Sequence, residues 1–269
     1  MKLDHAAVVA GFDAQVRRGT QPDGSGSLAE RAGPVVRCTS SGGSGWSGIA
    51  WSGLDPGTAD EVIADQIRFF EAGGERFEWK LYSYDRPADL SHRLLAEGFV
   101  PGEPEALMVA EAAGLVGGSR TLADVRLPDG IRLVPVTDEA GIGRLIEVHD
   151  RVFGTGHAQL RSSLSAQLRD SPQSIAMVVA MAGDEPVCSA RIDFYARSEF
   201  AGLYGGGTLP QWRGRGIYRA LVAYRAQLAA ARGYRFIQVD ASPESRPILE
   251  RLGFACLALT TPYTWSPGD

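Results

Sequence analysis

Glycines and arginines of one short segment carry the clearest chemical signal in the sequence. The segment LPQWRGRGIYRAL places Gly214 and Gly216 on either side of Arg215, with Arg213 and Arg219 close by. If a helix begins there, its first N–H groups and the positive end of its dipole face outward, and the glycines let a phosphate approach the backbone. Arginine side chains add charge-assisted hydrogen bonds. The segment therefore predicts an anion site, most simply for a di- or triphosphate.

Other phosphate-binding motifs fit the sequence poorly. It contains no GxxxxGK[ST], and residue 219 is arginine where a dinucleotide fingerprint starting at Gly214 would need glycine or alanine. A formal GxGxxG at Gly43, Gly45 and Gly48 leads into the apolar residues IAW instead of a helix. That context favours a glycine-rich hairpin over a nucleotide site.

The elements around the arginine-rich segment follow a definite order. Ile217, Leu221, Tyr224 and Leu228 recur at helical spacing, and Gly233 follows where a helix end favours glycine. The predicted order is a strand over 201–208, the glycine turn, this helix, a strand over 234–239, a short helix within 242–252 and a last strand. Upstream, we expect a strand from 131, helices over 139–153 and 158–170, and two strands joined by a turn at 183–185.

The same order appears once more, 155 residues earlier in the chain. Leu94, Gly98 and Phe99 stand at that offset from the LxxxGF of the last short helix. A helix over 59–72 and an alternating strand from Phe77 precede them. Two copies of one α/β unit explain this repeat, with a boundary between Gly114 and Gly130.

At these residues the sequence resembles the GNAT acyltransferase superfamily. Gln211–Gly216 matches its Q/R-x-x-G-x-G/A signature, and the matching order of elements covers residues 130–269. Residues 1–115 resemble a second, degenerate copy without the glycine turn, because the equivalent place reads LDPGTADEV, and 116–129 form a linker. The resemblance implies an α/β protein of two tandem GNAT-like folds, each a mixed, mostly antiparallel twisted sheet flanked by helices.

The resemblance also implies acetyl-CoA or another acyl-CoA as donor and a primary amine of a small molecule or peptide as acceptor. The backbone of the glycine turn would hold the pyrophosphate, and the end of the preceding strand would pair with pantetheine where it splays from the next strand. Serine replaces the asparagine that the family often has at position 242. The implied donor-binding residues are Thr208, Leu209, Arg213, Gly214, Arg215, Gly216, Ile217, Tyr218 and Ser242.

The departing thiol lacks an obvious proton donor in this sequence. Many family members place a tyrosine four residues before the glycine of the terminal GF, and that position is Leu249 here. Tyr218, Tyr263 or Ser245 could substitute, or the thiolate could leave with help from water. A backbone N–H near residues 208–209 could stabilise the oxyanion. The loss of the tyrosine also motivates a rival function, a catalytically silent acyl-CoA-binding sensor.

The strand that follows the turn at 183–185 offers candidates for the general base. Alternation places Ser189, Arg191, Asp193 and Tyr195 on one face of that strand, although a solvated strand face gives the same pattern. Asp193 is the favoured base, with Glu199 and a water-mediated route as alternatives. The catalytic candidates are therefore Asp193 and Ser245.

Charge argues against nucleic acid as a partner. The net charge is −5, and residues 1–129 hold 12 Lys and Arg against 19 Asp and Glu, while residues 130–269 hold 15 against 13. An acidic chain has no general attraction for phosphate backbones. The electrostatic field of the acidic first half predicts a positively charged acceptor substrate. The EWKLYSYDRP segment (residues 78–87) is expected to pack the first half's core or to face an acceptor cleft between the halves.

Metal, disulfide and membrane roles are not expected. Cys38, Cys188 and Cys256 are odd in number and far apart, and His149 and His157 do not form a ligand set at their spacing. No run approaches the roughly 20 apolar residues of a membrane span. The N-terminus lacks a basic leader, which predicts a cytoplasmic protein. The sequence gives no indication of the oligomeric state.

Overall fold

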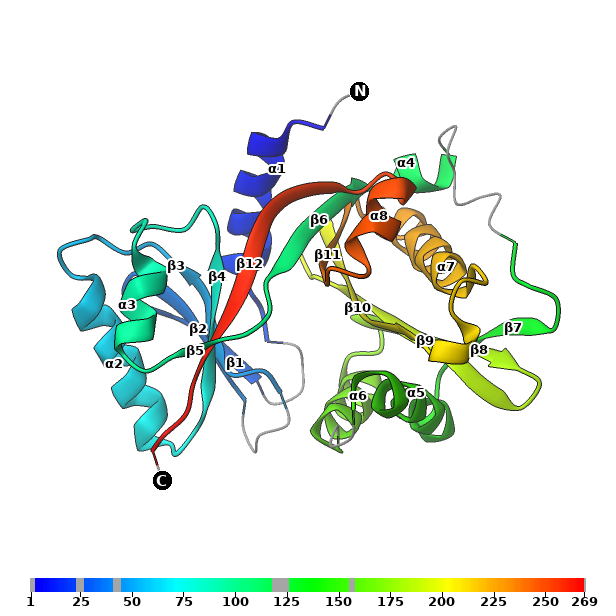
Figure 1. The fold of residues 1–269 in the computed structure, drawn as a ribbon, viewed down its shortest axis with the longest axis horizontal. Helices are drawn as coiled ribbons and strands as arrows, with labels where there is room; N and C mark the ends of the chain where they lie inside the picture. The colour runs from blue at the N-terminus through cyan, green and yellow to red at the C-terminus, as the bar shows by residue number, and fades with distance from the viewer. Residues whose placement is uncertain (1–2, 23–26, 41–44, 118–125, 155–157, 269) are drawn as a thin grey trace.

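The computed structural model describes residues 3–22, 27–40, 45–117, 126–154 and 158–268. Within them, one continuous sheet of twelve strands runs through both halves of the chain in the order β1-β2-β3-β4-β12-β6-β11-β10-β9-β8-β7, with β5 paired to β12 (Figure 1). Most strand pairs are antiparallel. The expected α/β class with mixed, mostly antiparallel pairing is thereby confirmed.

The first half opens with elements that the sequence did not indicate. Helix α1 and strands β1 and β2 lie upstream of residue 46, where we predicted no helix or strand. The exposed residues of β1 are Leu28, Glu30 and Arg31, a mixture of apolar and charged side chains, so hydrophobic periodicity gives no signal there. The elements are α1 (His5–Phe12), the π-helical turn Asp13–Arg17, β1 (Ser27–Ala32), β2 (Val35–Ser40), β3 (Gly48–Ser52), α2 (Ala59–Ala72), β4 (Phe77–Tyr82), α3 (Leu90–Ala96), β5 (Val100–Pro101), β6 (Glu105–Glu111) and α4 (Ala112–Gly117).

The second half follows its expected order of elements. Local chemistry explains the boundaries: the Asp138 side chain accepts from the Gly141 N–H at 2.7 Å to begin α5, and Gly253 ends α8 with a left-handed backbone. The elements are β7 (Ile131–Val136), α5 (Glu139–Phe153), α6 (Ala158–Asp170), β8 (Ile175–Ala182), β9 (Glu185–Phe194), β10 (Phe200–Thr208), the 3₁₀ turn Pro210–Trp212, α7 (Ile217–Ala231), β11 (Phe236–Ala241), α8 (Arg246–Leu252) and β12 (Ala255–Trp265).

The two halves exchange their last strands. β6, from the first half, pairs with β11 of the second, with Leu107 opposite Asp240. β12 ends the chain by inserting between β6 and β4, with Tyr263 opposite Trp79. Figure 1 shows the long red strand β12 crossing from the second half to the first. The exchange makes one sheet of two units and brings β4 near the strands of the second half.

The helices divide between two faces of the second half's sheet. Leu221, Val222 and Leu249 bring α7 and α8 onto one face, which we call the α7 face. Ile142 and Leu164 bring α5 and α6 onto the other, which we call the α5 face, and α1 extends this cover toward the centre of the sheet. No helix among the described residues is long and apolar enough to cross a membrane.

A buried ion pair fixes α1 to the first half. Both Nη atoms of Arg17 donate to Asp85 at 2.8 Å, and the two side chains are 3% exposed. Tyr82 lies under the Arg17 guanidinium, with its ring centroid 4.1 Å from Cζ. Most of the EWKLYSYDRP segment therefore packs inside the first half or against α1. Of its two expected placements, this is the one in the core of the first half.

Replacing Arg17 with methionine should destabilise the protein strongly, because it leaves the Asp85 carboxylate buried without a counter-ion, with only the Tyr82 N–H, among the described residues, still donating to it. We expect a loss of about 3–5 kcal/mol in the free energy of unfolding, measured by urea denaturation. The matched control is Arg93→Met, which breaks pairs to the more exposed Asp60 and Asp89 and should cost under about 1 kcal/mol. Equal losses in the two variants would contradict this account of the Arg17 pair.

Candidate functional site

The glycine turn has the backbone that an anion site needs. Gly214 and Gly216 have φ of +75° and +83°, and α7 begins at the next residue, Ile217. A Cβ added at either glycine would have nothing within 4 Å, so conformation and not space requires glycine here. The N–H groups of the first turn of α7 point out of the helix end beside this open backbone.

Arginine side chains surround the turn. The Arg213 Nε donates to the Thr208 carbonyl at 3.1 Å, which ties the turn to the end of β10. Arg215 lies over the Trp212 ring, with Cζ 4.7 Å from the centroid. Both side chains belong to exposed residues, so positive charge is displayed at the mouth of the turn. The structure thus brings together the predicted loop residues from Thr208 to Tyr218.

Strands β10 and β11 diverge after Gly202, along the part of β10 that leads to this turn. Their parallel pairing covers only Phe200–Gly202 against Phe236–Gln238. From Leu203 to Thr208, β10 keeps its antiparallel partner β9 but no longer pairs with β11. The backbone edge of β10 beyond Gly202 is therefore available to the amides of an extended ligand.

A β-bulge interrupts β10 within this unpaired stretch. Tyr204 pairs with Arg191 and Gly207 with Ser189, so β10 carries one extra residue, and Gly205 has φ of +57°. The Leu209 N–H, by contrast, donates to the Val187 carbonyl at 3.0 Å on the β9 side. That bond occupies the Leu209 amide. The bulge is therefore the place where the ladder between β10 and β9 is irregular.

A polar cluster lies on the α5 face, where β10 and β11 part. Alternation places its members on one face of their strands, and α1 and α5 cover the sheet on either side. The central polar cluster consists of Lys80, Arg191, Asp193, Tyr195, Tyr204, Gln238 and Asp240.

Hydrogen bonds join the middle of the central polar cluster. The Tyr195 and Tyr204 hydroxyls are 2.5 Å apart, and the Gln238 amide donates to them at 2.8 and 3.2 Å. The Tyr195 hydroxyl lies directly over Gly202, where an added Cβ would be 2.1 Å from it. Burial raises the pKa of both phenols, so both stay protonated near neutral pH.

Two ion pairs flank these tyrosines. The Lys80 ammonium contacts Asp240 Oδ2 at 2.5 Å, and Arg191 Nε lies 3.5 Å from Asp193 Oδ1. Burial lowers the pKa of Lys80, but the charge of Asp240 outweighs burial and holds that pKa well above its usual value. Lys80 comes from β4 of the first half, so the strand exchange gives the cluster residues from both halves.

Two buried acceptor atoms that β11 contributes to the cluster lack hydrogen-bond donors among the described residues. They are Gln238 Oε1 and Asp240 Oδ1, on side chains 2% and 9% exposed. They lie on the same face of β11, two positions apart. Buried acceptors without donors are costly, so this part of the cluster suits a ligand that brings N–H groups.

The predicted catalytic residues occupy different places. Asp193 belongs to the central polar cluster and its side chain is 21% exposed. Ser245 precedes α8, and its hydroxyl donates to the Ser242 carbonyl at 3.3 Å, so these two serines form a local turn after β11. Leu249 is fully buried in the core on the α7 face and supplies no polar group.

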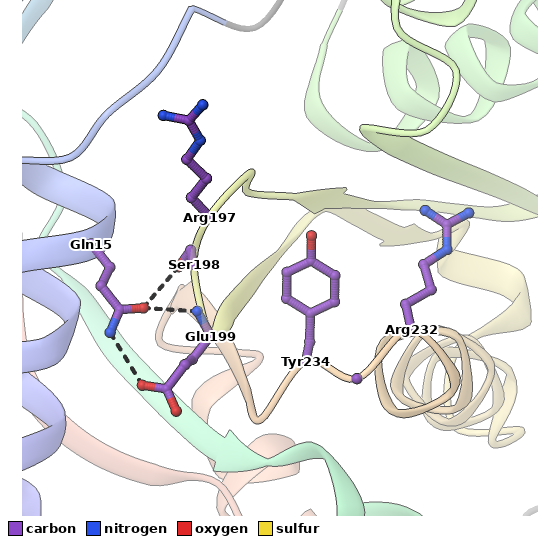
Figure 2. Close-up of a pocket in the computed structure, with 7 residues that line it drawn as sticks. Gln15, Arg197, Ser198, Glu199, Arg232 and Tyr234 are labelled. Atoms are coloured by element: carbon purple, nitrogen blue, oxygen red, sulfur yellow. Dashed lines mark hydrogen bonds between the residues drawn. The ribbon is translucent and has the colours of Figure 1, made fainter.

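Two catalytic alternatives lie away from the cluster, and one histidine weighed as a metal ligand lies outside the described residues. Tyr263 packs in the first half's core opposite Trp79. Glu199 precedes β10, at the opposite end of that strand from Thr208, and Figure 2 shows it bonded to Gln15 in a surface pocket with Arg197, Arg232 and Tyr234. His157 lies outside the described residues. Among those described, no group of three His, Cys, Asp or Glu could hold a metal ion.

The sequence reasoning missed Lys80, Tyr204, Gln238 and Asp240. Alternation along FIQVDA does place Gln238 and Asp240 on one face, so a weak signal for them exists. Lys80 gives no signal, because only the strand exchange brings it to β11.

Gly202→Ala should disturb the cluster, because its Cβ would overlap the Tyr195 hydroxyl. We expect a loss of about 1–3 kcal/mol in the free energy of unfolding. Gly143→Ala in α5 is the control, since its nearest neighbour is an Arg161 side chain at 3.8 Å, and it should be neutral or slightly stabilising. Thermal unfolding of both variants measures this, and an unchanged Gly202→Ala midpoint would refute the tight contact.

Comparison with known protein families gives a match within the second half of the chain. Residues 138–262 match the model of the acetyltransferase (GNAT) domain. A comparison of the sequence with curated proteins gives no match.

Solved structures share the fold over nearly the whole chain. A GCN5-related N-acetyltransferase from Kribbella flavida superposes with a TM-score of 0.68 at 18% identity, covering 98% of this chain and 95% of that one. A tandem GNAT protein from the clavulanic acid biosynthesis pathway gives 0.61 at 12% identity, with 99% and 97% covered. A GCN5-related N-acetyltransferase from Sphaerobacter thermophilus gives 0.60 at 12% identity, with 98% and 86% covered. At these identities the likeness concerns the fold.

Proposed function

We propose that this chain transfers an acetyl group from acetyl-CoA to a primary amine of a small molecule or peptide, a function that the match of residues 138–262 to the acetyltransferase (GNAT) domain supports. One observation carries the proposal: the left-handed glycine turn at the start of α7 follows the end of β10, whose residues from Leu203 to Thr208 no longer pair with β11. An anion site and an unpaired strand edge at one place suit a long donor with a pyrophosphate at one end and amides along its arm.

The donor's binding follows from the chain's own groups. The N–H groups of residues 213–218 would hold the pyrophosphate, with Arg213 and Arg215 adding charge. The arm would run along β10 toward Gly202, past Thr208, and Ser242 would border it from the end of β11. The open space above Gly214 and Gly216 supports this fit, because no neighbour occupies it within 4 Å of an added Cβ.

The acceptor amine would enter from the α5 face, where the central polar cluster lies. Asp193 would accept the amine's proton, directly or through water, and Gln238 Oε1 and Asp240 Oδ1 would receive N–H bonds. The amine nitrogen then attacks the thioester carbonyl carbon, the carbon–sulfur bond breaks, and the bonding pair leaves with sulfur. The proton lost by the amine finally resides on the thiol of CoA, with Ser245 as our candidate to deliver it.

A silent acyl-CoA sensor is the second candidate, because Leu249 is buried in the core where the family often has a tyrosine. Incubation with acetyl-CoA and a panel of amines, with a thiol assay for released CoA, separates the two functions. Turnover with any amine supports the transferase. Tight acetyl-CoA binding without CoA release across the panel would favour the sensor.

Valine at Gly216 or Gly214 should remove acetyl-CoA binding, since a β-branched residue cannot hold a left-handed backbone without strain. We expect affinity to fall at least about tenfold by calorimetry, equivalent to about 1.4 kcal/mol. Gly233→Val is the matched control, because Gly233 has φ of +79° at the other end of α7 and an added Cβ there also meets nothing. If the Gly216 variant binds like the native chain, the pyrophosphate has been misplaced.

Asp193→Asn should slow transfer and leave acetyl-CoA binding intact. Loss of a general base typically costs about 10²–10⁴ in kcat, measured as CoA release with an amine that turns over. Asp184→Asn, in the exposed turn between β8 and β9, is the charge-matched control and should be silent. Native-like kcat in the Asp193 variant would remove this residue from the mechanism.

A further inference from the structure

A buried cation without a counter-ion lies beneath the β10 bulge. Arg225 is on α7 and only 1% exposed. Its Nε donates to the Leu221 carbonyl at 3.0 Å and its Nη1 to the Arg191 carbonyl at 2.9 Å. Nη2 is buried and has no hydrogen-bond partner among the described residues. Among the residues that the structure describes, no carboxylate forms an ion pair with Arg225.

This arrangement is unfavourable for stability alone. Burial lowers the pKa of Arg225, because a guanidinium loses its hydration in the core. Buried charges are normally paired, because taking a charge out of water costs free energy that only a partner offsets. A chain that retains such a group has a use for its charge or its hydrogen bonds.

The guanidinium lies against the backbone of the bulge. Arg191, whose carbonyl it binds, is paired with Tyr204 directly before the extra residue. A Cβ added at Gly206 would be 3.6 Å from Arg225 Nη2 and 3.0 Å from Tyr218 Cε2. Gly206 belongs to the stretch of β10 that no longer pairs with β11. The Nη2 group of Arg225 is therefore separated from the gap between β10 and β11 by the backbone of β10.

The titratable groups that face Arg225 do not neutralise it. Tyr218, from the same helix, and Cys188, from β9, are its titratable neighbours. Burial raises the pKa of Tyr218 and raises that of Cys188 to about 11, so both are uncharged near neutral pH. From the α5 face, His149 lies at Gly205, with Nδ1 3.8 Å from an added Cβ. No anion among these groups compensates the guanidinium.

We propose that Arg225 is a positioning residue for the transfer step, which holds the bulge in place and whose uncompensated charge stabilises the departing sulfur of CoA. The inference rests on the proposed function. When the carbon–sulfur bond breaks, its electron pair stays on sulfur, and a fixed positive charge nearby stabilises that thiolate before the amine's proton reaches it. The chain can then work without a tyrosine at position 249.

The test needs no acceptor. The thiol of CoA bound to the native chain is titrated by the ultraviolet absorbance of its thiolate, with CoA lacking the sulfur as the blank. We expect its pKa about one unit below the free thiol value of about 8.5, which is tenfold more thiolate at a given lower pH. Arg225→Met and Arg225→Gln should return the pKa to the free value, and Arg225→Lys should keep most of the shift.

The outcomes are separable. If the two neutral variants bind CoA and its thiol titrates as in the native chain, the proposal is wrong. If those variants do not fold, the native titration decides alone, since an unshifted bound thiol overturns the proposal as well. A native chain that binds no CoA refutes the proposed function instead.

Discussion

The brevity of the pairing between β10 and β11 is the constraint on which the site depends. Three residue pairs hold the strands together and then they separate, so the backbone of β10 has an open edge. The separation is stabilised from both sides, because β9 keeps its ladder with β10 and β6 keeps its ladder with β11. A ligand can occupy the gap without breaking either ladder, and the glycine turn lies at its mouth.

The exchange of β6 and β12 determines which other side chains lie near this gap. With β12 inserted between β4 and β6, and β6 paired with β11, the first half cannot separate from the second without breaking three ladders of the central sheet. The same exchange brings Lys80 to Asp240, whose carboxylate would otherwise be buried alone. The acidic first half therefore supplies a cation, not an anion, to the cluster, and its net charge alone does not describe its part in the site.

Local patterns in the sequence predicted much of the fold and the donor side of the site. The helices α2, α5 and α6 have the bounds that periodicity and capping indicate, because their apolar faces and end residues are encoded locally. The glycine turn is equally local. Strand partners are not, since nothing in ACLALTTPYTW states that it will pair with β4. The position of Lys80 beside β11 and the bulge of β10 depend on such partners and could not be predicted from spacing.

A crystal structure with acetyl-CoA bound tests the central claim most directly, because the claim concerns where one molecule lies. The account predicts the pyrophosphate within hydrogen-bond distance of the N–H groups of residues 213–218, and the arm between β10 and β11 with its thioester near Gly205 and Gly206. A donor bound elsewhere, or strands β10 and β11 paired beyond Gly202 in the complex, would contradict it.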